Sequence, residues 1–215
     1  METLCLSHLI EEAMPLFPGT EPPSVKRIFS VDKDQFAETR LSFSSHTGTH
    51  MDAPAHMIPG GRTLDHFDPG SFTGPGALID VTAFGGEEIP FDIFRHNEED
   101  IRKSAYLLLY TGWARLWGRP DYFDKYPVLA PETALWLVSQ PLKGIGIDAP
   151  SFDPVEGHQR IHHILLGKEL LLVENLTGLE RLKGRSFSFS AFPLLYKEAD
   201  GAPVYATASF SSSSS

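Results

Sequence analysis

Glycine and proline interrupt this chain along its whole length. Among 215 residues there are 18 glycines and 17 prolines, spread over the sequence. Both residues break regular structure and favour turns, so they divide the chain into many short segments. This pattern predicts a turn-rich α/β or α+β protein. The hydrophobic fraction of 41% and the charged fraction of 21% are those of a globular protein, not of a disordered chain or a coiled coil.

The chain shows no internal repeat and no linker. Its length fits one large domain better than two small ones, so residues 1–210 are expected to form a single domain. Five serines, residues 211–215, end the chain. They can bury nothing, and we expect a disordered or artificially added tail there.

The net negative charge of the chain argues against a nucleic acid as a binding partner. Lys and Arg number 18 against 28 Asp and Glu, a net charge of −10, with no basic run for a nucleic acid. Cys5 is the only cysteine, which excludes an intrachain disulfide and a cysteine-based zinc site. Apolar runs are too short for a membrane span. The first 25 residues lack Lys and Arg, so no secretory signal is expected and the cytoplasm is the expected location.

Short β-rich runs predict most of the regular structure. Residues 106–110 read YLLLY and are expected to form a buried central strand. Residues 39–45 alternate, with Leu41 and Phe43 on one face. Residues 131–138 begin with proline and an acidic residue, which favours a helix. The other expected strands are residues 77–81, 144–147, 170–173, 186–192 and 204–209, and the other expected helices are residues 98–105 and 162–167.

The segment from residue 46 to residue 56 reads HTGTHMDAPAH. Its metal-capable side chains, His46, His50, Asp52 and His56, all occupy even positions, so in an extended chain they project from one face. Glycine, two threonines and a proline disfavour a helix. We therefore expect a strand end or extended loop that aims three imidazoles and a carboxylate the same way. The alternatives are hydrogen-bonded histidines in a polar loop and a purely structural metal site.

Spacing suggests different roles within this run. Cα atoms four residues apart in a strand are about 13 Å apart, so His46 and His50 can share one ion if the chain bends. Gly48 permits that bend and leaves room for the ion. Asp52 can add a carboxylate that bridges two ions. His56 is expected to lie farther away and to suit proton transfer.

Further ligands must come from downstream. Glu174 directly follows an apolar strand, where sites form in α/β folds. The adjacent His162 and His163 offer another imidazole, and the residues alone leave open which of the two would bind the metal. Imidazole ligands suit Zn²⁺, as one or two ions, and a carboxylate-rich pair also suits Mn²⁺.

The motif His-x-Gly-Thr-His-x-Asp-x-Pro-x-His resembles the signature of the metal-dependent cyclase-like hydrolase family, which includes bacterial kynurenine formamidases and isatin hydrolases. The resemblance extends over nearly the whole chain. It also includes residues 14–19 (MPLFPG), the GID-x-x-S-x-D pattern of residues 146–153, residues 174–176 (ENL) and residues 200–204 (DGAPV).

The resemblance implies a swivelling β/β/α fold with a strand-rich mixed sheet and few helices, and a homodimer whose second subunit helps to close the pocket. It implies His56 as the catalytic acid/base. It implies as metal ligands His46, His50, Asp52, His162 and Glu174.

One departure from the family pattern concerns the substrate. Phe17 occupies the position where the bacterial kynurenine formamidases typically carry a tryptophan that packs on the substrate; phenylalanine keeps an aromatic face but loses area and the indole N–H. The expected activity is attack of metal-activated water on an amide, with an aryl formamide such as N-formylkynurenine as the first candidate. The alternatives are an isatin or lactone hydrolase, a metal-assisted lyase or dehydratase acting on a hydroxy acid, and a binding protein without turnover.

Overall fold

The computed structural model describes residues 1–86 and 88–211. Within these residues the chain is rich in strands, and its α-helices are only four to seven residues long. Of the expected serine tail, residues 212–215 lie outside the described residues. The strands are β1 (Glu2–Cys5), β2 (Ser24–Phe29), β3 (Glu38–Ser42), β4 (His50–Asp52), β5 (Thr73–Asp80), β6 (Glu88–Ile89), β7 (Tyr106–Tyr110), β8 (Val128–Leu129), β9 (Gly144–Ile147), β10 (Leu171–Glu174), β11 (Phe187–Pro193) and β12 (Gly201–Phe210). The helices are α1 (Val31–Asp34), α2 (Phe91–His96), α3 (Glu98–Arg102), α4 (Pro131–Leu137) and α5 (Arg160–Leu166).

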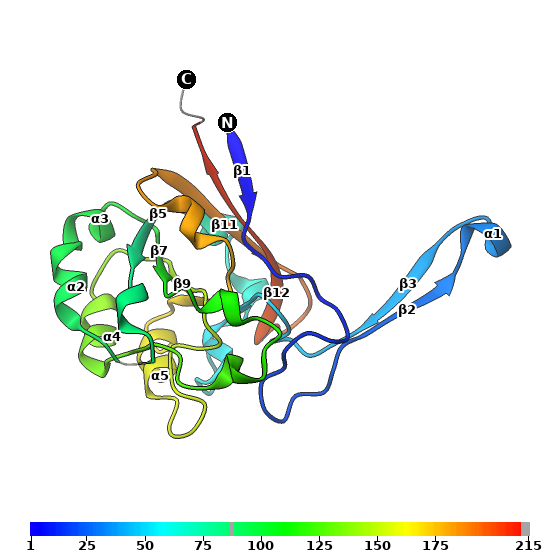
Figure 1. Ribbon diagram of the computed structural model, residues 1–215, viewed down its shortest axis with the longest axis horizontal. Helices are drawn as coiled ribbons and strands as arrows, with labels where there is room; N and C mark the ends of the chain where they lie inside the picture. Colours follow the sequence, from blue (N-terminus) through cyan, green and yellow to red (C-terminus); the bar gives the residue numbers. More distant parts are fainter. Residues whose placement is uncertain (87, 212–215) are drawn as a thin grey trace.

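One mixed sheet closes on itself. Its order is β1-β12-β11-β5-β7-β9-β10-β4, and β12 also pairs with β4, so the strands from β12 round to β4 form a ring. Figure 1 labels β5, β7, β9, β11 and β12 of this sheet in the body of the protein. Strands β5, β7, β9 and β10 are parallel to one another, and the remaining pairs of this sheet are antiparallel. The expected strand-rich mixed sheet with few helices is confirmed.

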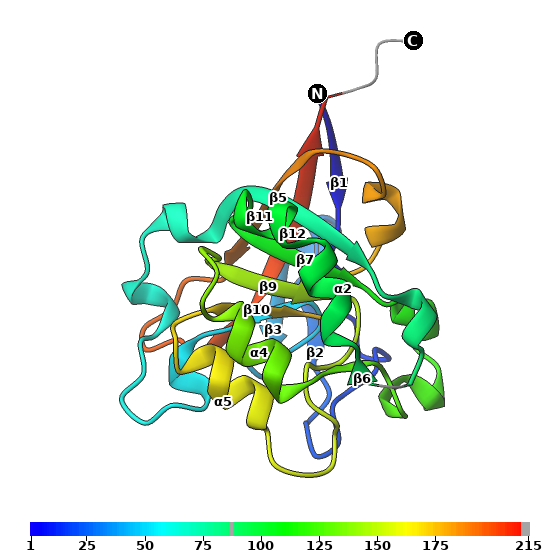
Figure 2. The ribbon, with the colours of Figure 1, turned by 90° about the vertical axis from the view of Figure 1, so that its left-hand side faces the viewer.

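Alternation along the central strands separates two hydrophobic cores. Tyr106 and Leu108 of β7 belong to the cluster inside the ring, whereas Leu107 and Leu109 belong to the cluster under the helices. Helices α2, α4 and α5 cover that outer face (Figure 2). The neighbouring strand β9 turns glycines inward. A Cβ on Gly146 would lie 2.7 Å from Leu108 Cδ2, so a larger residue would collide with the inner core.

Several expected elements appear with small shifts in their ends. Strands β7 and β9 have the expected bounds, and α4 begins at Pro131 as expected. The expected pair formed by residues 186–192 and 204–209 corresponds to β11 and β12, which are antiparallel neighbours. Strands β1 and β2 and helices α1 and α2 were not expected from the sequence.

A hairpin of β2 and β3 projects from the body and carries α1 at its tip (Figure 1). The expected alternating strand at residues 39–45 corresponds to β3, but every residue of β3 is exposed. Leu41 is 56% exposed. Alternation here therefore reflects a free two-stranded arm, not a half-buried strand of the main sheet.

Across the described residues, we find no helix with the length and apolar character that a membrane crossing requires. The cytoplasmic location stays a prediction.

Candidate metal centre

The metal-capable side chains gather where the ring closes. Strand β4 lies between β10 and β12, so that His50 is opposite Glu174 on one side and Pro203 on the other. Asp52 is opposite Gly201 of β12. His50 and Asp52 have equal parity and face the same side of β4, as the sequence predicts.

The run from residue 46 to residue 56 is extended only over β4. His46 lies in the preceding turn, and residues Pro54–His56 form a 3₁₀ turn. Gly48 has a φ of 66°, which favours glycine, so it supplies the expected bend. A Cβ at Gly48 would make only ordinary van der Waals contacts, with Ile10 and Met14, so the requirement for glycine that the structure shows is conformational. The expected room for an ion stays a prediction. The single extended face predicted for all four side chains is wrong, because these turns redirect the chain.

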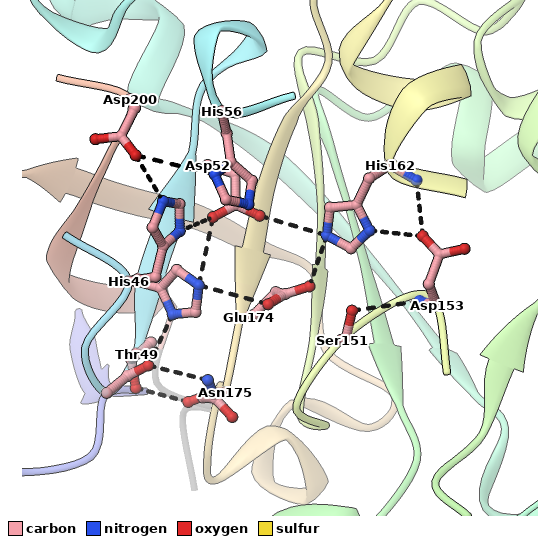
Figure 3. A network of polar contacts seen from close by, with 12 residues as sticks. His46, Thr49, Asp52, His56, Ser151, Asp153, His162, Glu174, Asn175 and Asp200 are labelled. Carbon is pink, nitrogen blue, oxygen red and sulfur yellow. Dashed lines mark hydrogen bonds and ion pairs between the residues drawn. The ribbon is translucent and has the colours of Figure 1, made fainter. Parts of the chain in front are cut away.

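Two buried carboxylates and two imidazoles form the inner group of the site (Figure 3). His50 Nε2 lies 3.3 Å from Asp52 Oδ1 and 3.4 Å from Glu174 Oε2. His162 Nε2 lies 3.1 Å from Glu174 Oε1 and 3.5 Å from Asp52 Oδ2. All four residues are buried. Their ring nitrogens and carboxylate oxygens thus converge on one small region.

A second group shares Asp52 with the first. His46 Nδ1 lies 2.7 Å from Asp52 Oδ1, and His46 Nε2 lies 3.0 Å from Asp200 Oδ2. The rings of His46 and His56 are 3.9 Å apart between centroids. Ligand atoms of His46, Asp52 and His56 all lie within 4.8 Å of one another. The expected separation of His56 from the ligands is therefore absent, and its proton-transfer role stays a prediction.

Hydrogen bonds orient the two inner imidazoles. The Nδ1–H of His162 donates to Asp153 Oδ2 at 2.7 Å, and the Nδ1–H of His50 donates to the carbonyl oxygen of Gly48 at 2.9 Å. Each bond leaves Nε2 as the nitrogen that faces the carboxylates, the arrangement typical of metal-binding histidines. His163 is exposed and its Nδ1 contacts the carbonyl oxygen of Gln159. The structure therefore brings His162 into the cluster and leaves His163 outside it.

The electrostatics of the cluster fit a bound cation. Burial by itself raises the pKa of Asp52, but His46 and His50 outweigh it and hold that pKa well below its usual range. Burial by itself lowers the pKa of His50, but Asp52 and Glu174 raise it to about 10. Buried ionised carboxylates need nearby positive charge. Imidazolium protons provide it here, and a divalent cation held by the same nitrogens and oxygens would provide it equally.

A cavity of about 340 Å³ opens above the cluster. Its lining includes the converging histidines and carboxylates together with Met14, Met57, Phe17, Trp117 and Phe123. Phe17 is 40% exposed and meets Phe123 edge to face, with 5.9 Å between the ring centroids. The size and the mixture of apolar walls with a few convergent polar groups are typical of a small-molecule site.

The sequence did not predict that four residues would lie at or next to this site. Asp153 and Asp200 stand in segments that resemble the family pattern, but the sequence gives no distance from either to a histidine. Trp117 and Phe123 carry no motif at all. Only the fold brings Trp117 and Phe123 to the cavity wall, and Asp153 and Asp200 to the histidines.

Comparison with known proteins agrees with this architecture. A family model described as "Putative cyclase" matches residues 4–154. A kynurenine formamidase of Geobacillus thermodenitrificans is 30% identical over 204 residues, which cover 94% of each chain. An uncharacterised protein of Methanocaldococcus jannaschii is 31% identical over 87% of this chain and 90% of its own.

Solved structures share the fold. A structure described as a potential metal-dependent hydrolase with cyclase activity is 26% identical, with a TM-score of 0.78 over 96% of both chains. Isatin hydrolase A of Ralstonia solanacearum has a TM-score of 0.86 at 23% identity, over 96% of this chain and 91% of its own.

The chain therefore belongs to the cyclase-like family of metal-dependent hydrolases. It is a hydrolase with a metal cofactor that acts on small molecules, and the expected membership is confirmed.

Proposed function

We propose that this enzyme hydrolyses an N-aryl formamide, with N-formylkynurenine as the first candidate. The observation that carries the proposal is a single cavity that is lined both by the carboxylate–imidazole cluster and by aromatic side chains. Such a cavity suits a substrate with a reactive polar group joined to an aromatic ring. Similarity to kynurenine formamidases over 94% of the chain supports the same substrate class.

The proposed ligands are His46, His50, Asp52, His162 and Glu174, holding one or two divalent ions. Zn²⁺ is the first candidate because most of these ligands are imidazoles, and Mn²⁺ is the alternative. When bound, such an ion lowers the pKa of its water and polarises a carbonyl group.

His56 is the proposed proton carrier. It borders the cavity, and its side chain is 27% exposed, so a substrate can reach it. Burial lowers its pKa despite the nearby Asp52, so the imidazole is neutral at pH 7 and can accept a proton. In the proposed reaction His56 takes the proton of the attacking water and gives it to the departing aryl nitrogen as the C–N bond breaks. The products are formate and an aryl amine.

The substrate test uses the metal-loaded enzyme with N-formylkynurenine, formanilide and isatin. We expect hydrolysis of the two formamides. We also expect Phe17→Trp to raise kcat/KM for N-formylkynurenine by up to about tenfold, because a larger ring stacks more strongly on the substrate. Isatin opening with both formamides untouched would exclude the formamidase. Water lost from a hydroxy acid, seen by mass spectrometry, would indicate a lyase, and aromatic ligands bound without any turnover would indicate a binding protein.

We also propose that the enzyme is a homodimer in which the arm of β2 and β3 packs on the second subunit. The arm leaves five apolar side chains at least 39% exposed: Val25, Phe29, Val31, Phe36 and Leu41. A two-stranded hairpin with no packing partner is marginally stable in water. A second copy of the chain would cover this apolar surface and stabilise the arm.

The double variant Phe36→Glu/Leu41→Glu is expected to be monomeric by analytical ultracentrifugation, whereas the unmodified enzyme is expected to be a dimer. The two charges would oppose burial of the arm. Leu135→Glu is the matched control, because Leu135 is 57% exposed on α4 in the body of the protein. A dimer that survives both changes in the arm would show that the arm is not the interface.

A further inference from the structure

Trp117 enters the cavity wall with a second ring stacked against it. The ring centroids of His8 and Trp117 are 3.9 Å apart, and the ring planes differ by 6°. Tyr122 meets Trp117 at 81° with centroids 5.2 Å apart. Trp117 borders the cavity, whereas His8 and Tyr122 do not. The indole therefore packs against two rings that do not line the cavity, while Trp117 itself lines it.

His8 acts in this stack as a neutral aromatic ring. Burial lowers its pKa to about 4, so it carries no charge at neutral pH. Its Nε2 is buried and has no hydrogen-bond partner among the described residues. Its ring stacks parallel on the indole of Trp117.

Hydrogen bonds connect the stack of His8 and Trp117 to the segment that carries the proposed metal ligands. The backbone N–H of His8 donates to Thr49 Oγ1 at 2.9 Å, and the Thr49 hydroxyl donates to the carbonyl oxygen of Asn175 at 2.6 Å. Thr49 directly precedes His50, and Asn175 directly follows Glu174. The position of His8, and with it the plane of Trp117, is thus set relative to the proposed ligands.

Hydrogen bonds also connect the loop that carries Trp117 to Asn175. The indole Nε1–H of Trp113 donates to the carbonyl oxygen of Tyr122 at 2.7 Å. The Tyr122 hydroxyl donates to Asn175 Oδ1 at 2.7 Å. Asn175 therefore connects both the loop of Trp117 and, through Thr49, the backbone of His8.

Phe17 is supported much less. It is 40% exposed, and the ring contact found for it is the edge-to-face contact with Phe123. A ring whose plane is fixed before binding loses less conformational freedom when a ligand stacks on it. Trp117 is therefore better prepared than Phe17 to bind a flat ring.

We propose that Trp117, held in place by His8, is the residue that selects an aromatic group on the substrate. This inference rests on the proposed amide hydrolysis for its substrate class. It makes Trp117 the main determinant of specificity for an aryl group, with Phe17 in a lesser role.

The test compares formanilide with N-cyclohexylformamide, which has a saturated ring of similar size. In Trp117→Leu we expect the KM for formanilide to rise about 2- to 10-fold while that for N-cyclohexylformamide changes little, because leucine keeps an apolar surface but has no aromatic face. Trp117→Phe should recover most of the selectivity. Phe17→Leu is the matched comparison and should show the same kind of aromatic-selective loss, but a smaller one than Trp117→Leu, in keeping with its lesser role. Metal content, measured by elemental analysis, should be the same in all variants.

Binding of acetanilide provides a readout that does not need turnover. Measured by isothermal titration calorimetry, acetanilide should bind to the metal-loaded enzyme, about 2- to 10-fold more weakly to Trp117→Leu, and with intermediate affinity to His8→Ala. Equal losses for the aromatic and saturated rings in Trp117→Leu, an aromatic-selective loss in Phe17→Leu at least as large as that in Trp117→Leu, or unchanged acetanilide affinity in Trp117→Leu would each overturn the inference. If no formamide is hydrolysed but acetanilide affinity still follows Trp117, the proposed reaction fails and the aromatic platform stands.

Discussion

His56→Ala is expected to keep its bound metal and to lose about 10²–10⁴-fold in kcat, the usual contribution of general acid–base catalysis. The expected loss is large because no other imidazole is free for proton transfer in the proposed arrangement. His46, His50 and His162 each have a ring nitrogen within 3.5 Å of Asp52. His56 instead packs against His46, with the ring planes tilted by 37°, and borders the cavity.

The alternative role for His56 is that of a metal ligand, and its position close to the proposed ligands requires a test that separates the two roles. A ring nitrogen of His56 lies within 4.8 Å of ligand atoms of His46 and Asp52. Elemental analysis of the purified variant separates the two assignments. Loss of metal equal to that in His50→Ala would make His56 a ligand and remove the proton-carrier role. His66→Ala is the control, since His66 is exposed and should change neither metal content nor rate.

The predictable part of the fold is the part that local sequence determines. A wholly apolar run such as β7 can be stable only when buried on both faces, and β9 combines inward glycines with isoleucines under the helices. Closure of the ring depends instead on β4 pairing with β12, which are about 150 residues apart. No local pattern encodes that pairing. The exposed arm is a similar case, because an alternating strand has the same sequence signature whether a core or a second subunit covers it.

The site, like the fold, has a part that the sequence predicts and a part that depends on contacts between distant segments. Motif and residue chemistry were sufficient to select the histidines and carboxylates that the fold brings together. Their arrangement was not predictable from strand parity, because Gly48 and the turn at Pro54–His56 redirect the chain on either side of β4. Contacts between distant segments were also outside the reach of the sequence. Asp200 reaches His46 across 154 positions, and His8 stacks on Trp117 only because β1 leads the chain past the metal-binding segment.

His50→Ala is expected to lose most of the bound metal, and with it the hydrolase activity. His50 Nε2 lies between Asp52 and Glu174, within 3.4 Å of an oxygen of each, so it is central to the inner group. Its removal leaves two buried carboxylates with one imidazole fewer to offset their charge. A divalent ion would also lose a nitrogen ligand that the Gly48 carbonyl holds in orientation.

The measurement is metal content per chain after dialysis, with circular dichroism to show that the variant is folded. Because an alanine here also removes the partner of buried charges, His50→Gln serves as a second variant that keeps a polar side chain of similar reach. His163→Ala is the matched control: it removes a histidine one position from His162, but from the exposed face of α5. Full metal content in folded His50→Ala and His50→Gln would show that the cluster on β4 is not the metal site. If His163→Ala loses metal and His162→Ala does not, the metal ligand on α5 is His163. That result would contradict the hydrogen bond to Asp153, which directs Nε2 of His162 toward Glu174.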